Sequence, residues 1–311
     1  MKIGVHLGNY STGNTGERVL EIGRMADRLG FDSVWASDHV VVPSVMESIY
    51  PYHALGKTFT PDSAELFYEA IVTLSVLAGA TSRVRLGTSV LVIPQRNPLV
   101  VAKQLSTLDD LSGGRLHVGV GAGWLAEEYE ALNMPFKTRW QALEEYIGIF
   151  RTVWTERDAA FSGETYSFNP VRMAPKPVQA GGPPITIGGH SARALRLAGT
   201  HASGLHAFRL SPEHVRQSLD EMRRNAEMAG RDPSELTVVM RCDLAARGSM
   251  TPEEAEVWRF AGTAEQVASQ IKVYEEQGVS ELLLTIAEKW PAAEADETMQ
   301  WFAEDILPIV R

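Results

Sequence analysis

The sequence predicts one (β/α)8 barrel, because eight short apolar or β-branched runs alternate with longer segments of helical periodicity. Such alternation is typical of parallel βα units, and 311 residues suit one barrel without a second domain. A chain of this length buries a large core. Its one cysteine, Cys242, excludes an internal disulfide and a zinc site built on several cysteines. We therefore expect residues 1–311 to form a single α/β barrel domain.

The predicted strands are the eight runs at residues 3–7, 33–36, 84–92, 116–120, 185–188, 204–207, 237–242 and 281–286. The first helix is predicted over 17–29, where the apolar residues share one stripe. Gly30 follows at the position where helices end in a left-handed residue, and Gly278 stands in the same place before the eighth strand.

The remaining helix signals are a cap and a terminal segment. Asn97 is a capping residue, and Pro98 stands at the first helical position, so together they open a helix over 99–111. A last helix over 292–306 closes the barrel.

Three stretches, about 41–62, 155–183 and 245–262, are longer than βα loops require. The first and third follow strands 2 and 7, which places them at the C-terminal face, where barrel active sites lie. We interpret these two as candidate lids, and the alternative is surface loops without a role.

The charge balance limits the class of partner. The chain has 29 Lys and Arg against 39 Asp and Glu, a net charge of −10, which disfavours nucleic acid and anionic membrane surfaces. The polar N-terminus does not resemble a signal peptide, and no apolar run approaches the roughly 18 to 20 residues of a membrane span. We expect a cytoplasmic protein that acts on a small molecule.

Several motifs fall short of known signatures. The glycine turn at 119–124 lacks the last glycine of the dinucleotide fingerprint, and the sequence at 56–58 lacks the first glycine and the strand of a P-loop. Residues 189–193 lack the closing glycine of a serine-hydrolase elbow. Neither H-E-x-x-H nor C-x-x-C occurs, so we expect no metal site.

The first candidate for chemistry is Ser37-Asp38-His39, directly after strand 2 and thus at the catalytic rim. A histidine can give or take a proton near neutral pH, while the adjacent carboxylate of Asp38 can bond a polar ring or raise the basicity of the histidine. The alternative is a loop histidine without a role.

Small residues mark two further strand ends. In 87–90, glycine and hydroxyl residues stand where a strand is usually bulky, which indicates a bulge or a close approach by ligand or backbone, or else ordinary packing. Gly119, Gly121 and Gly123 leave little side chain above the backbone, so a flat ring can lie there with Trp124 as one wall. The alternative is a tight strand-to-helix turn.

The fourth candidate is the turn Gly188-Gly189-His190-Ser191, which leads from strand 5 into a helix over 192–198. Amides at such a turn suit a phosphate, and Ser191 can cap the helix and touch the same anion. The alternative is a plain helix cap.

Together these motifs resemble the luciferase-like monooxygenase superfamily, in particular its branch that uses the deazaflavin coenzyme F420. The resemblance covers nearly the whole chain and rests on the segments 30–39, 87–90, 113–115, 119–124, 175–177 and 187–189. It implies a (β/α)8 barrel with insertions on the C-terminal face and a homodimer.

Carried over to this sequence, the resemblance implies roles for individual residues. Asp38 would bond the deazaflavin ring and His39 would handle the proton. The Ser89–Val90 peptide would be the family's non-prolyl cis bond behind the ring. Further cofactor contacts would come from the ring side and the phosphate side, at Ala122, Gly123, Gly188, Gly189, His190 and Ser191.

Three positions depart from the family pattern. Trp124 stands where sugar-phosphate dehydrogenases have a second acid/base glutamate, which disfavours glucose-6-phosphate. Glu127 occupies the place of an asparagine that would bond the coenzyme, and Val92 replaces a threonine. Trp124 and Trp35, together with Tyr50, Tyr52, Phe59 and Phe67, favour an aromatic substrate side, with packing as the alternative.

The favoured function is F420-dependent hydride transfer between the coenzyme and a small organic substrate, with a proton supplied through His39. One alternative is an FMN-dependent luciferase-like monooxygenase whose reduced FMN comes from a separate reductase. A second alternative is a non-catalytic barrel that binds small ligands.

Overall fold

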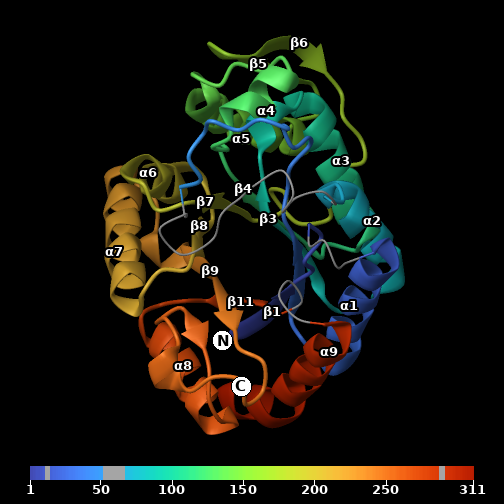
Figure 1. Cartoon of the computed structure of the whole chain (residues 1–311). Coiled ribbons are helices and arrows are strands. Elements are labelled where there is room, and N and C mark those ends of the chain that lie inside the picture. The colour runs from blue at the N-terminus through green and yellow to red at the C-terminus, as the bar shows by residue number, and fades with distance from the viewer. Residues whose placement is uncertain (11–14, 52–66, 287–290) are drawn as a thin grey trace.

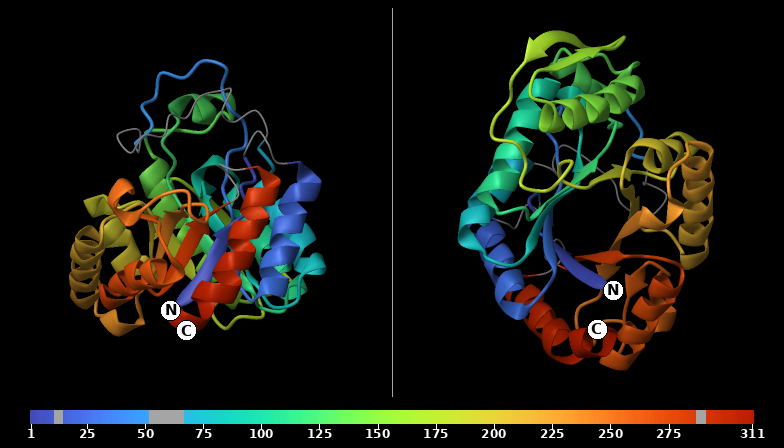
Figure 2. Two further views of the ribbon diagram at one scale, coloured as in Figure 1. Left: turned by 60° about the horizontal axis from the view of Figure 1, so that its bottom comes forward. Right: turned by 180° about the vertical axis from the view of Figure 1, so that it is seen from behind.

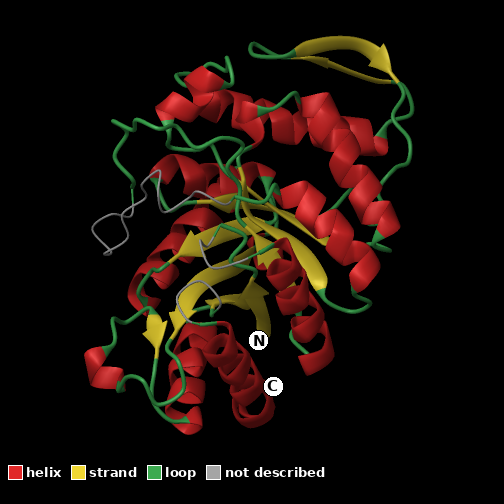
Figure 3. Cartoon of the chain, turned by 45° about the vertical axis from the view of Figure 1, so that its right-hand side comes forward, coloured by secondary structure: helices red, strands yellow, loops and turns green. Residues whose placement is uncertain are grey.

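The computed structural model describes residues 1–10, 15–51, 67–286 and 291–311. Its eight parallel strands close into a barrel that helices surround (Figures 1 and 3). Around the barrel the strands are β1 (Lys2–His6), β2 (Ser33–Ala36), β3 (Arg85–Leu91), β4 (Leu116–Val120), β7 (Ile185–Gly188), β8 (Gly204–Phe208), β9 (Thr237–Leu244) and β11 (Glu281–Thr285). All eight predicted strands are confirmed, with ends that shift by at most two residues.

The helices follow the strands along the chain. They are α1 (Gly16–Leu29), α2 (Ala70–Ala80), α3 (Pro98–Leu111), α4 (Ala126–Ala131), α5 (Arg139–Thr155), α6 (Ala192–His201), α7 (Pro212–Met228), α8 (Ala264–Glu276), α9 (Ala292–Trp301) and α10 (Leu307–Val310). The predicted last helix is confirmed, and it continues through a π-helical turn, Phe302–Ile306, into α10. In the part of the chain that is described, no helix has the length and apolar character to cross a membrane.

The predicted caps are confirmed. Gly30 ends α1 with φ 91°, and its amide donates to the carbonyl of Ala26. The side chain of Asn97 accepts from the amides of Leu99 and Val100 at the start of α3. These local signals fix where the helices begin and end, and so where each strand enters the barrel.

Two of the three predicted insertions contain regular secondary structure. Residues 155–183 contain an antiparallel hairpin, β5 (Ala159–Ser162) and β6 (Ser167–Val171), which lies outside the ring of helices (Figure 3). Residues 245–262 contain a short strand, β10 (Arg259–Phe260), that pairs with β9.

Part of the first insertion, with the predicted aromatic residues Tyr52 and Phe59, lies outside the described residues. Its described part, residues 41–51, lies over the end of the barrel opposite to both termini (Figure 2, left). This placement agrees with an insertion on the C-terminal face.

Trp35 fills the interior of the barrel, and its predicted place on the substrate side is wrong. The side chain has 0% exposure and packs with Val239 and Leu283. A Cβ atom on Gly87 would lie 2.2 Å from Cε3 of Trp35, so the close approach predicted for this glycine is that of the indole. The ring sits beside the imidazole of His117, with centroids 5.0 Å apart, and that of His206, at 5.1 Å.

Candidate active site

The ends of neighbouring barrel strands meet at Val90. The Ser89–Val90 peptide bond is cis, as the resemblance implies. A Cβ atom on Gly121 would lie 2.8 Å from Cγ2 of Val90, and one on Gly188 would lie 2.9 Å from the same atom. The ends of β3, β4 and β7 are therefore in contact through one side chain, on the face where barrel enzymes bind their ligands.

The glycines at the end of β4 make room for side chains of this chain. A Cβ atom on Gly119 would lie 3.2 Å from Cγ1 of Val90, and one on Gly123 would lie 2.7 Å from Cγ1 of Val92. The space that a Cβ atom would take at these glycines is thus used by groups of this chain, including the carbonyl of Thr88 at Gly119, while a flat ring lying along this turn stays a prediction. Gly123 also needs its glycine for φ 70°.

Ala122 and Gly123 are held by the helices that follow β4. Ala122 is 3% exposed, and its carbonyl accepts a hydrogen bond of 2.6 Å from the hydroxyl of Tyr129. The carbonyl of Gly123 accepts from Nε of Arg139 at 3.2 Å. Contact between these two residues and a coenzyme ring stays a prediction.

Asp38 connects the end of β2 to the end of β3. Nη2 of Arg96 donates to Oδ1 of Asp38 at 2.6 Å, while Nη1 of Arg96 and the amide of Val92 donate to Oδ2 at 2.8 and 2.9 Å. Burial acts to lower the pKa of Arg96, but attraction to Asp38 raises it above its usual value. This charged pair braces the rim, and direct bonding of Asp38 to a ring stays a prediction.

His39 is paired with a carboxylate that sequence reasoning missed. Nδ1 of His39 lies 2.8 Å from Oε2 of Glu128, whose side chain is 1% exposed. The imidazole meets the ring of Phe67 edge-on, with centroids 5.2 Å apart, and that of Trp124 at 6.3 Å. A titratable group thus stands among aromatic rings at the barrel mouth.

The hydroxyl of Ser37 has a full set of hydrogen bonds. The amide of Gly8 donates to Nδ1 of His6, so Nε2 of His6 carries the proton and donates to Oγ of Ser37 at 2.8 Å. Nη1 of Arg241 donates to the same oxygen at 3.2 Å. Oγ of Ser37 in turn donates to the carbonyl of Ser89 at 3.0 Å, which fixes the orientation of the cis peptide.

A buried histidine holds the side chain of Ser89. Nε2 of His206 lies 2.9 Å from Oγ of Ser89. Burial, followed by the charges of Arg241 and His6, lowers the pKa of His206 to about 3. The imidazole is therefore neutral at physiological pH and supports the strand end without carrying charge.

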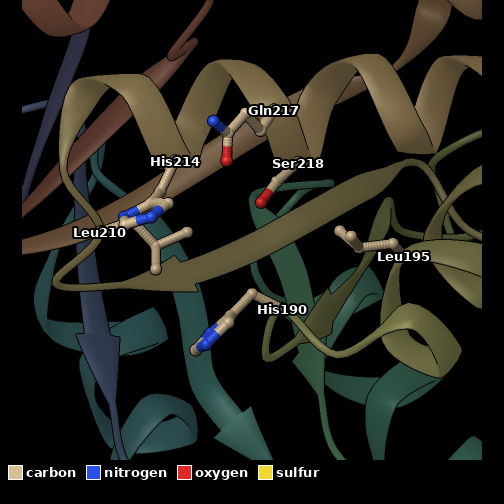
Figure 4. A pocket seen from close by; sticks show the side chains of 6 residues that line it. All are labelled: His190, Leu195, Leu210, His214, Gln217 and Ser218. Carbon is tan, nitrogen blue, oxygen red and sulfur yellow. The ribbon is translucent and has the colours of Figure 1, made fainter.

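The predicted phosphate turn lies at the edge of a pocket of about 300 Å³ (Figure 4). His190 contributes to this pocket from the turn after β7, and the rest of the lining comes from α6, α7 and the segment before α7, at Leu195, Leu210, His214, Gln217 and Ser218. Ser191 caps α6, since its side chain accepts from the amide of Ala194.

One amide of this turn is already bonded within the protein. The amide of Gly189 donates to the carbonyl of His206 at 3.3 Å. A Cβ atom on Gly188 would meet Val90, so this glycine serves the packing of the strand ends. Binding of a phosphate by Gly188, Gly189, His190 and Ser191 stays a prediction.

Comparison with known proteins identifies the family. The model of the luciferase-like monooxygenase family matches residues 1–305. This chain belongs to the luciferase-like monooxygenase family. The resemblance of its motifs to this family is thereby confirmed.

Relatives of this luciferase-like protein include a monooxygenase that depends on FMNH2. An uncharacterized protein of Mycobacterium tuberculosis is 32% identical over 221 residues, 71% of this chain and 75% of its own. An FMNH2-dependent dimethylsulfone monooxygenase of Pseudomonas putida is 25% identical over 293 residues, 78% of this chain and 79% of its own.

Solved structures show the same fold. A monooxygenase from Streptomyces bottropensis has TM-score 0.82 and 24% identity, with 99% of both chains covered. An F420-dependent secondary alcohol dehydrogenase in complex with an F420-acetone adduct has TM-score 0.79 and 20% identity, covering 100% of this chain and 99% of that one. Proteins similar to this chain thus include an F420-dependent enzyme and an FMNH2-dependent one.

In this luciferase-like barrel, the carboxylate of Glu127 binds the first insertion and not, as predicted, the coenzyme. Oε1 of Glu127 accepts from the amides of Glu47 and Ser48 at 2.6 and 2.8 Å. Burial acts to raise the pKa of Glu127, but hydrogen bonds from the Ser48 side chain and these amides lower it to about 2. The reason is that α4 directs the side chain of Glu127 toward residues 47–48.

Trp124 keeps the position at the mouth that the sequence predicted for it. Its ring meets that of Tyr50 from the first insertion, with centroids 5.2 Å apart, as well as that of His39. Phe67, whose ring also meets His39, stacks on Tyr10, with centroids 5.2 Å apart. A role of Trp124 toward the substrate stays a prediction.

Proposed function

We propose that this luciferase-like protein is an F420-dependent oxidoreductase that transfers a hydride between the deazaflavin coenzyme and a small organic substrate. The observation that carries the proposal is His39, which stands at the C-terminal mouth beside the strand ends that meet at Val90. When bound, the coenzyme would supply the hydride chemistry, and the protein would supply position and a proton.

His39 has the surroundings of a proton carrier. Its Nδ1 is bonded to Glu128, so a proton exchanged with a substrate passes through Nε2. If a carbonyl compound is reduced, its carbon receives the hydride and its oxygen takes a proton from His39, which gives an alcohol. In the opposite direction His39 accepts the hydroxyl proton while the carbon loses the hydride. Proton transfer by a placed group typically contributes about 10² to 10⁴-fold in rate.

Two features of the chain fit a long planar coenzyme with an anionic tail. Ser89 and Val90 at the end of β3 are partly exposed, and Asp38 lies on the same rim, where it accepts from the amide of Val92. The turn at His190 and Ser191 borders a pocket at the start of α6, where amides and the helix dipole favour a phosphate. We assign the ring to the former and the tail to the latter.

The rings around His39 favour an apolar substrate. Phe67, Trp124, Tyr50 and Tyr10 form a run of ring contacts at the mouth. Aromatic side chains bind apolar ligands and exclude water from the reacting atoms. We therefore propose a small apolar carbonyl compound or alcohol as the substrate class.

The test is coenzyme binding by the purified protein. Titration with F420 and, separately, with FMN is followed by the fluorescence of each coenzyme. Saturable binding of F420 with weak or no binding of FMN is the expected result. Tight binding of FMN without F420 binding overturns the proposal.

The second candidate is an FMN-dependent monooxygenase supplied by a separate reductase. It is favoured by the dimethylsulfone monooxygenase, which matches 78% of this chain. This candidate predicts oxygen consumption that depends on reduced FMN and on an organic substrate. If neither coenzyme binds, the non-catalytic barrel is the function that remains.

A further inference from the structure

Glu128 connects the proposed proton carrier to the segment that follows it. Oε2 of Glu128 bonds Nδ1 of His39, while Oε1 accepts from the amide of Val40 at 2.7 Å and from that of Val41 at 3.3 Å. The two oxygens of this carboxylate therefore bind different groups. One faces the imidazole and the other holds the start of residues 40–51.

The protonation state of Glu128 determines the tautomer of His39. Burial acts to raise the pKa of Glu128, but hydrogen bonds from His39, Gln95 and Val40 lower it below its usual value. An ionised carboxylate can only accept hydrogen bonds, so Nδ1 of His39 must carry a proton. In the neutral imidazole Nε2 is then the acceptor, which is the form a general base requires.

From these contacts we infer that Glu128 is a positioning residue that selects the tautomer of His39 able to accept a proton at Nε2. The inference rests on the role of His39 in the proposed function. It adds that the amides of Val40 and Val41 hold the other oxygen of Glu128 and so keep the carboxylate turned toward His39.

Glutamine at position 128 is a sharp test because its orientation is predictable. The amides of Val40 and Val41 can donate only to the oxygen of a glutamine, so its NH2 group would face Nδ1 of His39. The imidazole would then accept at Nδ1 and carry its proton on Nε2. Glu128→Gln thus inverts the tautomer while it keeps the size of the side chain.

Among the described residues, further charged groups lie near His39. Asp38 precedes His39, and Arg96, which neutralises Asp38, also lies close enough to interact with Glu128. Glu69, at the start of α2, lies 3.5 Å from Nη2 of Arg96. None of these groups is altered by Glu128→Gln.

Glu127→Gln is the matched control, since Glu127 is the adjacent residue and also holds the first insertion, but at residues 47–48. A purely structural role in holding the insertion would make the two variants behave alike. A role in tautomer selection separates them.

The first measurement uses the protein without coenzyme. Nitrogen-15 NMR of the imidazole side chains, with His39 assigned by comparison with His39→Asn, reports which ring nitrogen carries the proton. We expect the Nδ1–H form in the wild type and in Glu127→Gln, and the Nε2–H form in Glu128→Gln. An Nε2–H form in the wild type overturns the inference without any variant.

The second measurement is turnover against pH with the bound coenzyme. For Glu128→Gln we expect kcat to fall about 10²-fold or more, with KM and coenzyme affinity nearly unchanged. The acid limb of the profile should move to lower pH, because the imidazolium loses its anionic partner. Equal losses in both variants, with an unshifted profile, overturn the inference.

The two proposals fail differently. If the wild type binds neither F420 nor FMN, the proposed function is wrong, and the NMR result still decides whether Glu128 selects the tautomer. If F420 binds and turns over but the tautomer is the same in both glutamine variants, only the inference about Glu128 is wrong.

Discussion

A Cβ atom on Gly188 would lie 2.9 Å from Cγ2 of Val90, closer than side-chain carbons approach in folded proteins. Gly188→Ala should therefore destabilise the fold by about 1 to 3 kcal/mol, because the added methyl overfills the contact between β3 and β7. The measurement is the free energy of unfolding in urea. Gly79→Ala is the control, since a Cβ there meets nothing within 4 Å inside α2. That variant should be neutral or stabilised, and equal losses at both positions would contradict the role of Val90.

His39→Ala should lower kcat by about 10² to 10⁴-fold and leave coenzyme affinity nearly unchanged, because the imidazole acts on the proton and not on coenzyme binding. Steady-state kinetics and a coenzyme titration check the two parts. His201→Ala, a partly exposed residue at the end of α6, should keep wild-type kinetics. An unchanged turnover number in His39→Ala removes this residue from the mechanism.

Arg96→Ala should destabilise the protein by about 3 to 5 kcal/mol, because it leaves the carboxylate of Asp38 buried without its cation. Arg172→Ala breaks a pair with Asp158 in which both side chains are largely exposed, and it should cost less than about 1 kcal/mol. Unfolding in urea compares the two variants. Similar small losses would show that Asp38 finds another partner.

Stability should depend on pH through His206. The pKa of this imidazole is about 3 in the folded protein, against a usual value of 6.5. Between those values the unfolded chain binds the proton and the folded chain does not, so stability falls as pH decreases from 6.5 toward 3, by about 1.4 kcal/mol per pH unit for one proton. His206→Asn should show a shallower decline in the free energy of unfolding. Parallel curves for the two proteins would contradict the prediction.

Local signals in the sequence were sufficient for the barrel. The strands lie where β-branched runs stood, and α1 and α3 begin or end at Gly30 and Asn97 as their capping chemistry requires. The place of the cis bond, Ser89–Val90, followed from the family resemblance rather than from composition.

The partners at the site could not be predicted in the same way. Arg96 is 58 residues from Asp38, and Glu128 is 89 residues from His39, so only the closed barrel brings each pair together. Successive residues on a helix point about 100° apart, and this decides that Glu128 faces His39 while Glu127 faces the insertion. No periodic pattern distinguishes two adjacent glutamates in one short helix.

The misplaced tryptophan has a different cause. The prediction grouped Trp35 with the aromatic residues of the mouth, but alternation along β2 turns it into the barrel, between Gly4 and Gly87. The signal that would have found it is the pair of glycines on the neighbouring strands, which leaves a space of the size of an indole.

The buried indole of Trp35 also closes the axis of the barrel below the mouth. In the part of the chain that is described, a molecule that enters at the C-terminal end meets this packed side chain and its neighbours Val239 and Leu283. The substrate of the proposed reaction would therefore enter, and its product leave, at the same end of the barrel. Each product molecule would have to leave before the next substrate molecule binds.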